Sequence, residues 1–351
     1  MSLTRGMVPA PRTKEALSVP VATPRRHSVS FIGLGHMGRR HARVFAALPE
    51  RFRAVGAFDV DASQDVSPFA PRLASEAEAL ALADVVVIAT PTETHKACAL
   101  RALASGRSVL IEKPLCSVAA DAMAVADLSS AGPARLFVGH SERFNPVVRA
   151  LARLLRDDPP LSIDLRRVGP ARPVDVGALV NMGVHDFDLA GYLAGVDVRV
   201  RSVVARSASD STVEDLAHVL FTTATGAAGH LYVDRTLVTK SRTVTWTTAR
   251  WIYEGDLLAH RLWRTSRPVG ERSEVPLPAE EPLLAQALAF ADVLDGRASR
   301  ELATAYDGAR AVVLADEAAR LGEATGLVNI TEPTADVGLL GQASNRPRRP
   351  T

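Results

Sequence analysis

The sequence is poor in the features that mark several classes of protein. Its 351 residues include two cysteines, Cys98 and Cys116, which are too few for a disulfide framework and lack the spacing of a metal site. No apolar run approaches the roughly 18 residues that a membrane-spanning helix needs. We therefore expect a protein of the reducing cytoplasm, with no membrane partner and no bound metal.

The sequence also lacks a strong excess of either charge, because its formal net charge is +2 at pH 7. Most of the positive charge lies in its two ends. Residues 1–28 contain five basic side chains and one acidic, and the residues after Thr334 contain three arginines and one aspartate. The remaining residues are slightly acidic, so a broad basic surface for nucleic acid is not predicted.

Both ends are also rich in proline, serine, threonine and arginine, without hydrophobic periodicity. This composition predicts disordered extensions over residues 1–28 and 332–351. The first lacks the continuous apolar stretch of a secretory signal, and a transit peptide is the alternative to a solvated extension. The residues between the ends are numerous enough for two domains, which we expect over 29–145 and 146–331.

The clearest motif is GLGHMG, which follows an apolar strand over 28–32 and opens a helix over 36–48. In this context Gly33 permits a tight turn, Gly35 lets the backbone approach a pyrophosphate, and Gly38 lets helix and strand pack closely. The unpaired N–H groups at the start of the helix then face the phosphates. We therefore assign to cofactor binding the residues Gly33, Gly35, His36, Met37 and Gly38.

A second strand is expected over 52–58, and it ends at Asp59, 21 residues beyond Gly38. A carboxylate at this point accepts hydrogen bonds from the adenosine ribose hydroxyls and repels a 2′-phosphate. No arginine follows Asp59 directly, so NAD is favoured over NADP as the cofactor. The alternative is that Asp59 merely begins a turn.

The alternation of strand and helix continues through the first domain. A continuous apolar run over 83–89, typical of a buried parallel strand, is followed by a helical segment that stops at Gly106. Further strands are expected over 108–111 and 135–139, and Ser117 is expected to cap the helix between them. This pattern predicts an α/β domain with a doubly wound parallel sheet of the Rossmann type.

Ligands of such sheets bind at the carboxyl ends of the strands. Thr90 and Pro91 follow the apolar run, and Glu112 and Lys113 follow the next strand. We expect Thr90 and Pro91 to contact the cofactor, and Glu112 to lie near the nicotinamide ribose. His95 is either close to the cofactor or a solvent-facing residue of its helix.

Five segments of the sequence together resemble one known family. They are GLGHMG, ATPTETH, Glu112-Lys113-Pro114, Arg143-Phe144-x-Pro146 and Asn181-x-Gly183-x-His185-Asp186. They resemble the Gfo/Idh/MocA family, named for glucose–fructose oxidoreductase, inositol dehydrogenase and a rhizopine-catabolism protein, over about residues 29–325. The resemblance implies an NAD(P)-dependent oxidoreductase in which a Rossmann domain precedes an α/β domain with an open, largely antiparallel sheet.

The second half of the sequence agrees with that architecture. Asn145 and Pro146 suit the N-cap and first position of a helix, and the turn at Gly226 resembles a hairpin. Strands are expected at 199–206, 216–223, 228–234, 243–248 and 251–253, and helices at 282–294 and 305–321. Apolar alternation over 198–204 and the Trp246–Trp251 region offer more sheet surface than two helices bury, which predicts a homodimer or homotetramer.

Oxidation of a secondary alcohol needs a base for the hydroxyl proton, and Lys113 is the candidate. Its ordinary pKa near 10.4 leaves it cationic at neutral pH, so burial or nearby positive charge must lower that pKa. Pro114 biases Lys113 toward an extended backbone. The alternative is a surface lysine that happens to precede a turn.

His185 is the second catalytic candidate. In an α-helix Asn181, His185 and Asp188 share one face, which presents His185 to the substrate hydroxyl or, as a proton relay, to Lys113. The alternative is a buried histidine that a carboxylate satisfies. The family commonly has aspartate where Asn181 stands, and an amide orients the ring without stabilising an imidazolium.

The segment His140–Pro146 resembles the family's UDP-N-acetylglucosamine 3-dehydrogenase group more than its inositol dehydrogenases. Arginine geometry suits a diphosphate, and Arg143, with Arg166 or Arg167, is the candidate to meet one. The alternative for Arg166 and Arg167 is a strand exposed to water. We expect the substrate site to include Arg143, Asn145, Asn181 and Asp186.

These observations predict an NAD-dependent dehydrogenase that oxidises a secondary hydroxyl of a sugar or sugar nucleotide, with C3 of a UDP-N-acetylhexosamine as first choice. An inositol or free sugar is the second choice of substrate. Two further alternatives are a dinucleotide-binding regulator without turnover and an enzyme that uses NAD to cleave glycosides. The presence of Lys113 and His185 argues against the regulator.

Overall fold

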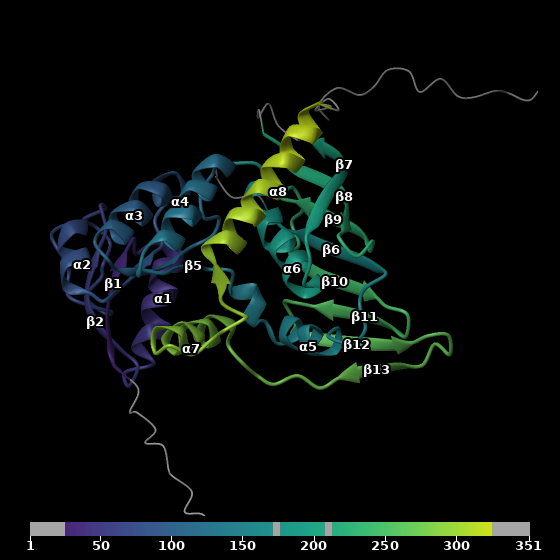
Figure 1. The fold of residues 1–351 in the computed structure, drawn as a ribbon, viewed down its shortest axis with the longest axis horizontal. Coiled ribbons are helices and arrows are strands. Elements are labelled where there is room, and N and C mark those ends of the chain that lie inside the picture. The colour runs from purple at the N-terminus through teal and green to yellow at the C-terminus, as the bar shows by residue number, and fades with distance from the viewer. Residues whose placement is uncertain (1–24, 171–175, 208–212, 325–351) are drawn as a thin grey trace, which may run out of the picture.

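The computed structural model describes residues 25–170, 176–207 and 213–324, which form two domains around two sheets (Figure 1). The predicted extension 332–351 and residues 1–24 of the extension 1–28 lie outside these residues. Residues 25–28 are described, and His27 and Ser28 belong to the first strand. Within the described ranges, no helix is long and apolar enough to span a membrane.

The first sheet has five parallel strands in the order β2-β1-β3-β4-β5. Their bounds are β1 (His27–Ile32), β2 (Phe52–Phe58), β3 (Val85–Ile88), β4 (Ser108–Ile111) and β5 (Leu136–Val138). Apart from β2, these strands are buried along nearly their whole length, which explains their continuous apolar sequences. The predicted doubly wound parallel sheet is confirmed.

Four helices connect these strands. They are α1 (His36–Ala46), α2 (Glu76–Leu82), α3 (Thr92–Ala104) and α4 (Ala119–Ala131). Helix α2 was not predicted; the hydroxyl of Ser75 caps it by accepting a hydrogen bond from the N–H of Glu78. Helix α4 has Val118 at its N-cap and no side-chain cap, so the predicted cap at Ser117 is wrong.

A short 3₁₀ turn, η1 (Ser141–Phe144), leads from the first sheet to α5 (Pro146–Leu154). The predicted cap of α5 is confirmed, because Asn145 Oδ1 accepts a hydrogen bond from the N–H of Val147 at 3.0 Å. Strand β6 (Ser162–Val168) follows. Helix α6 (Val184–Ala194) then begins after a π-helical turn, η2 (Leu179–Gly183), which the sequence did not indicate.

The second sheet has eight strands in the order β13-β12-β11-β10-β6-β9-β8-β7. The strands after β6 are β7 (Val198–Arg206), β8 (Leu216–Thr223), β9 (Ala228–Asp234), β10 (Ser241–Thr247), β11 (Trp251–Asp256), β12 (Arg261–Ser266) and β13 (Arg272–Val275). Only β6 and β9 pair in parallel, so the predicted open, largely antiparallel sheet is confirmed. Strands β12 and β13 were not predicted, because their sequences are polar.

The two faces of this sheet differ. Its inner face is apolar and packs under α5, α6 and the last helix of the fold (Figure 1). Trp246 lies fully buried on this inner face, so its expected contribution to an exposed sheet surface is wrong. On the outer face Val204 and Leu220 are about half exposed, and no helix of the described residues covers them.

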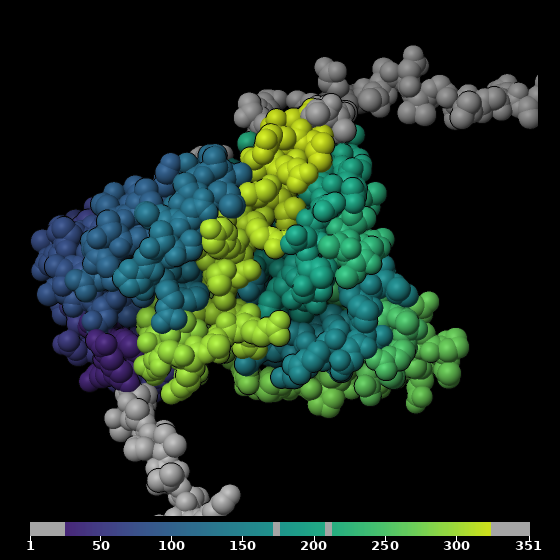
Figure 2. Space-filling view, viewed as in Figure 1, coloured from purple at the N-terminus to yellow at the C-terminus, as the bar shows by residue number. Residues whose placement is uncertain are grey.

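After the second sheet the chain returns to the first. Helix α7 (Pro282–Leu294) packs on α1, β14 (Ala303–Thr304) pairs antiparallel with β5, and α8 (Ala305–Ala324) contacts α4, α6 and β7. Figure 2 shows this returning segment wedged between the two domains. The ring of Phe290 on α7 meets those of Phe45, Phe52 and Phe137 from the first domain.

We expect Phe290→Ala to lower the free energy of unfolding by about 3–5 kcal/mol, because it opens a cavity among these rings. Urea unfolding followed by circular dichroism measures the change. Leu288→Ala on the more exposed side of the same helix is the matched control and should change stability by less than about 0.5 kcal/mol. Equal effects of the two substitutions would contradict the role given to Phe290.

Candidate active site

The glycine motif adopts the tight turn that its sequence predicts. Gly33 has a φ of +87°, a conformation that side chains disfavour, and Gly35 is the N-cap of α1. A Cβ on Gly38 would lie 2.0 Å from the carbonyl oxygen of Gly33, so only glycine allows the helix to approach the turn this closely. A Cβ on Gly35 would meet no protein atom within 4 Å, which leaves the backbone open to a ligand.

A cavity of about 660 Å³ lies at the carboxyl ends of β1, β2, β3 and β4, next to this turn. It brings together most of the residues predicted to bind the cofactor: Gly33, Gly35, Met37, Asp59, Thr90, Pro91, His95 and Glu112, together with Lys113. His36 and Gly38 do not line it, because His36 is exposed and Gly38 packs against Gly33. The cavity has the position that ligands take in sheets of this type.

Asp59 lies at the end of β2 with its carboxylate directed at the turn. Its Oδ2 accepts a hydrogen bond from the N–H of Leu34 at 2.6 Å, and its Oδ1 accepts one from the N–H of Asp61 at 2.9 Å. Each carboxylate oxygen retains a further acceptor position for a ribose hydroxyl. Arg39 lies nearby but its guanidinium is engaged, donating to the carbonyl of Leu34 and to Gln64.

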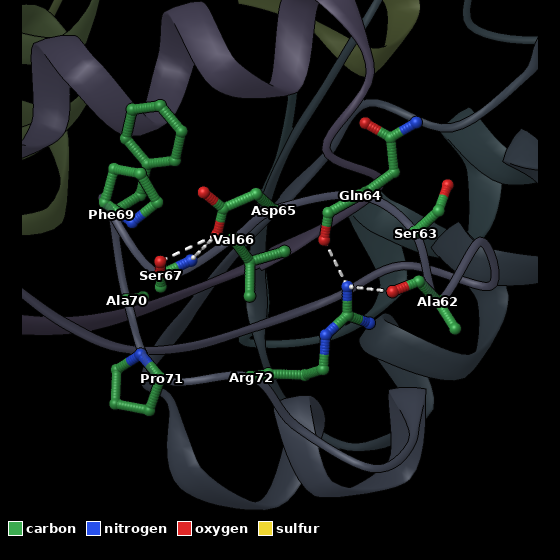
Figure 3. A pocket seen from close by; sticks show the side chains of 11 residues that line it. Ala62, Ser63, Gln64, Asp65, Val66, Ser67, Phe69, Ala70, Pro71 and Arg72 are labelled. Carbon is green, nitrogen blue, oxygen red and sulfur yellow. Dashed lines mark hydrogen bonds between the residues drawn. The ribbon is translucent and has the colours of Figure 1, made fainter.

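The loop after Asp59 folds over a second hollow of about 600 Å³, formed by residues 62–72 alone (Figure 3). The guanidinium of Arg72 donates to the carbonyl oxygens of Ala62 and Gln64, and the carboxylate of Asp65 accepts from Ser67. These internal bonds fix the loop. Gln64 belongs to both the hollow and the cofactor cavity, so the loop forms one wall at the ribose end of that cavity.

His95 and Glu112 line the cavity but also hold the protein together. The ring nitrogens of His95 lie 2.8 Å from the carbonyl oxygen of Pro114 and 2.9 Å from that of Thr90, and burial lowers the pKa of its ring. The predicted solvent-facing alternative for His95 is therefore wrong. Glu112 Oε1 lies 2.7 Å from Nε2 of the buried His41 on α1. Burial disfavours the charged carboxylate, but His41 and Lys113 outweigh it, so the pKa of Glu112 is lowered.

Lys113 leaves the end of β4 and points to the second domain. Its Nζ donates a hydrogen bond to the backbone carbonyl of Asn181 at 3.0 Å. Burial, helped by the charges of Arg167 and Arg242 and opposed by those of nearby carboxylates, lowers the pKa of Lys113 to about 8. The role of Lys113 as a base requires such a lowered pKa, and burial is its main cause.

Asn181 contacts Lys113 through its backbone carbonyl, and this contact was not predicted. It lies in the π-helical turn η2, where the α-helical spacing assumed between Asn181 and His185 does not hold. Nδ1 of His185 is buried without a hydrogen-bond partner among the described residues, so Asn181 does not hold the ring as expected. Burial, together with the charges of Lys113 and Arg167, lowers the pKa of His185 well below its ordinary value.

Two buried ion pairs hold α6 beneath this site. Both carboxylate oxygens of Asp186 accept from Arg167 of β6, at 2.9 and 3.0 Å, and both of Asp188 accept from Arg143 of η1, at 2.9 and 2.6 Å. Arg143 also lies 3.4 Å from Asp307. These charged groups are thus buried and paired within the protein, which argues against the predicted substrate contacts of Arg143 and Asp186.

The structure also revises other expected substrate contacts. Asn145 is buried, with its amide donating to the carbonyl of Leu257 while its oxygen caps α5. Arg166 lies over the ring of Tyr232 on the outer face of the second sheet, away from the site. Neither Arg166 nor the buried Arg167 is placed to meet a diphosphate.

Sequence reasoning missed several charged or titratable residues beside Lys113. Glu142 of η1 accepts from Arg167 at 3.1 Å and from Arg242 of β10 at 2.6 Å, and His140 is buried next to His185. Only pairing across the second sheet brings Arg242 opposite Arg167, so no local motif announces it. Among the described residues, no cluster of His, Cys, Asp or Glu is arranged to hold a metal ion.

Comparison with known families decides the ancestry of this arrangement. Residues 27–140 match an oxidoreductase family with an NAD-binding Rossmann fold, and residues 142–252 match the Gfo/Idh/MocA C-terminal domain. The chain belongs to the Gfo/Idh/MocA family. The resemblance found in the sequence and the expectation of NAD as cofactor are thereby confirmed.

Individual relatives narrow the comparison further. The chain is 32% identical over 211 residues to UDP-N-acetylglucosamine 3-dehydrogenase of Acidithiobacillus ferrooxidans, which is 58% of this chain and 66% of that one. It is 30% identical over 205 residues to inositol 2-dehydrogenase of Acidothermus cellulolyticus, covering 53% and 59% of the two chains. The matches thus span slightly less than two thirds of these relatives.

Solved structures agree over a longer stretch. A structure of the Acidithiobacillus ferrooxidans UDP-N-acetylglucosamine 3-dehydrogenase superposes with a TM-score of 0.77 at 26% identity, over 86% of this chain and 99% of that one. A levoglucosan dehydrogenase in complex with NADH gives a TM-score of 0.76 at 18% identity, which shows a shared fold. Gfo/Idh/MocA architecture therefore extends beyond the segments matched by sequence.

The residues present suit NAD, because the turn offers free N–H groups and the space over Gly35 is clear. We expect Gly35→Ala to leave the protein as stable as before but to raise the NAD dissociation constant about tenfold or more, since steric overlap costs about 1–3 kcal/mol. Fluorescence titration measures the constant. Gly132→Ala, also free of contacts within 4 Å, is the matched control. An unchanged constant in Gly35→Ala would place NAD elsewhere.

Proposed function

We propose that the protein oxidises a secondary hydroxyl of a sugar with NAD. The observation that carries this proposal is the state of Lys113, which lines the cofactor cavity, has a pKa of about 8 and hydrogen-bonds the turn before His185. An amine with such a pKa is suited to accept a proton near neutral pH. When bound, NAD supplies the acceptor for the hydride of the carbinol carbon.

In this proposal each residue has one task. Lys113 Nζ takes the hydroxyl proton, and the carbonyl of Asn181 holds the amine in position and accepts a hydrogen bond from it in either protonation state. His185, only partly buried, hydrogen-bonds a neighbouring hydroxyl of the sugar and orients the substrate. Asp59 accepts hydrogen bonds from the ribose hydroxyls of the adenosine and repels the 2′-phosphate of NADP.

We propose a UDP-N-acetylhexosamine, oxidised at C3, as the substrate. The 32% identity to a UDP-N-acetylglucosamine 3-dehydrogenase supports this choice, while the 30% identity to an inositol 2-dehydrogenase supports inositol as the alternative. Arg143 and Arg167 are buried in their ion pairs, whereas Arg242, although paired with Glu142, is partly exposed and is the candidate to meet a diphosphate. Its side chain is 37% exposed and its charge lies close enough to affect the pKa of Lys113.

A substrate screen tests the proposal. Purified protein with NAD is offered UDP-N-acetylglucosamine, UDP-N-acetylgalactosamine, myo-inositol and free hexoses, and NADH formation is followed by absorbance with the keto product identified by mass spectrometry. A higher kcat/KM for a UDP-sugar than for any polyol supports the proposed substrate, and the reverse order replaces it with the alternative. Absence of NADH with every hydroxyl compound would overturn the enzymatic proposal in favour of a regulator.

We expect Lys113→Ala to lower kcat about 10²–10⁴-fold while the NAD dissociation constant stays unchanged, because the amine acts as the base. In the wild type kcat should rise as the pH increases through about 8, since the neutral amine is the active form. This rise of kcat with pH should be absent in Lys113→Ala. Lys96→Ala, which removes a half-exposed lysine of α3, is the control and should retain the wild-type profile.

We also propose that a second copy of the chain covers the outer face of the second sheet. Val204 and Leu220 are about half exposed there, opposite His218 of β8 and His230 of β9, and are large apolar side chains on a face that no described helix covers. Leu220→Glu should convert a dimer or tetramer to monomer in light scattering at micromolar concentration. Leu82→Glu, on an equally exposed leucine of α2, should not. A monomeric wild type would contradict this assembly.

A further inference from the structure

Two histidine rings near Lys113 carry three nitrogens that lack hydrogen-bond partners among the described residues. Nδ1 and Nε2 of His140 and Nδ1 of His185 are all buried and make no hydrogen bond to the described residues. Buried polar atoms are nearly always paired, because an unpaired one costs about 1–3 kcal/mol. Three such atoms on two neighbouring rings indicate an arrangement that the side chains complete among themselves.

The geometry shows how that arrangement is made. His140 follows β5, directly before η1, and its ring stands edge-on to that of His185 with centroids 6.1 Å apart and an angle of 86° between the planes. On its other side, Nδ1 of His140 lies 3.7 Å from Oδ2 of Asp188, one turn after His185 on α6. The paired bonds from Arg143 keep the carboxylate of Asp188 in place.

Both rings are neutral, and a neutral imidazole has one N–H and one acceptor nitrogen. Burial lowers the pKa of His140; Asp188 and Asp307 oppose this and Arg143 and Lys113 add to it. For His185 burial is again the largest cause, reinforced by the charges of Lys113, Arg167 and Arg242.

If the two rings pair through Nε2 of His140 and Nδ1 of His185, only one assignment of protons satisfies all three nitrogens. If Nδ1 of His140 carries its proton toward Asp188, Nε2 of His140 becomes the acceptor. The proton of His185 then lies on Nδ1, where it is donated to His140. The remaining nitrogen of His185, Nε2, is left as an acceptor.

We propose that His140 is a positioning residue that links Asp188 to His185 and fixes His185 in the tautomer protonated at Nδ1. The contacts of His140 with Asp188 and with His185 shorten to hydrogen-bond length when substrate binds, as contacts in catalytic sites commonly do. The acceptor Nε2 of His185 then receives a hydrogen bond from a neighbouring hydroxyl of the sugar, while the proton of the hydroxyl being oxidised goes to Lys113. This role rests on the proposed function.

Nuclear magnetic resonance of protein labelled with ¹⁵N-histidine tests the tautomer directly, with and without NAD. The signals of His185 are assigned by their loss in His185→Gln. We expect the Nδ1–H form of His185 in the wild type and a shift toward the Nε2–H form in His140→Phe, which keeps a ring but removes both nitrogens. An Nε2–H form in the wild type, or no change in His140→Phe, overturns the proposal.

Kinetics supply a second readout. His140→Phe should lower kcat about 10- to 100-fold, the usual effect of removing the partner that orients an imidazole, without changing the NAD dissociation constant. His140→Gln supplies one donor and one acceptor and should recover most of the loss. If His140→Phe fails to fold, His140→Gln and the wild-type tautomer still decide, and an Nε2–H form in both overturns the proposal.

A matched control separates orientation from burial. His27 is another buried imidazole, with Nε2 2.9 Å from Asp295, at the opposite edge of the first sheet. His27→Phe should cost stability but leave kcat and the tautomer of His185 unchanged; equal kinetic losses in His27→Phe and His140→Phe overturn the positioning role. If no hydroxyl compound is oxidised, the proposed function fails while the tautomer still tests His140; turnover with an unaltered tautomer defeats this inference alone.

Discussion

Helix α6 lies where it does because two buried arginine–carboxylate pairs fix it from different elements. Arg167 of β6 holds Asp186, and Arg143 of η1 holds Asp188. Such pairs add little net stability, since desolvation offsets their attraction, yet loss of one partner costs about 3–5 kcal/mol by leaving a buried charge. They therefore specify a position more than they stabilise a fold. His185 lies on the same helix directly before the first of these aspartates and takes its place from them.

The same charges also set the acidity at Lys113. Arg167 lowers the pKa of that amine, while Glu142 opposes it and at the same time anchors Arg242. One network thus fixes both the geometry of α6 and the protonation of the lysine facing it. Changes to this network are expected to alter position and acidity together.

The parts of the structure that depend on local chemistry could be predicted from the sequence. Glycines that a turn requires, the Asn145 cap and the apolar strands all follow from neighbouring residues, and most of the predicted cofactor residues line one cavity. The contacts of Arg143 and Asp186 could not be predicted, because their partners lie on other elements and only tertiary pairing shows that their charges are neutralised. The π-helical turn at Asn181 could not be predicted either, because no residue type marks such a turn.

The return of α7 and β14 to the first sheet makes the nucleotide-binding domain discontinuous in the gene. A fragment that stopped at the start of the second domain would lack an edge strand and the ring of Phe290. A single crossover between two members of this family therefore cannot exchange complete domains, and a chimera needs two breakpoints.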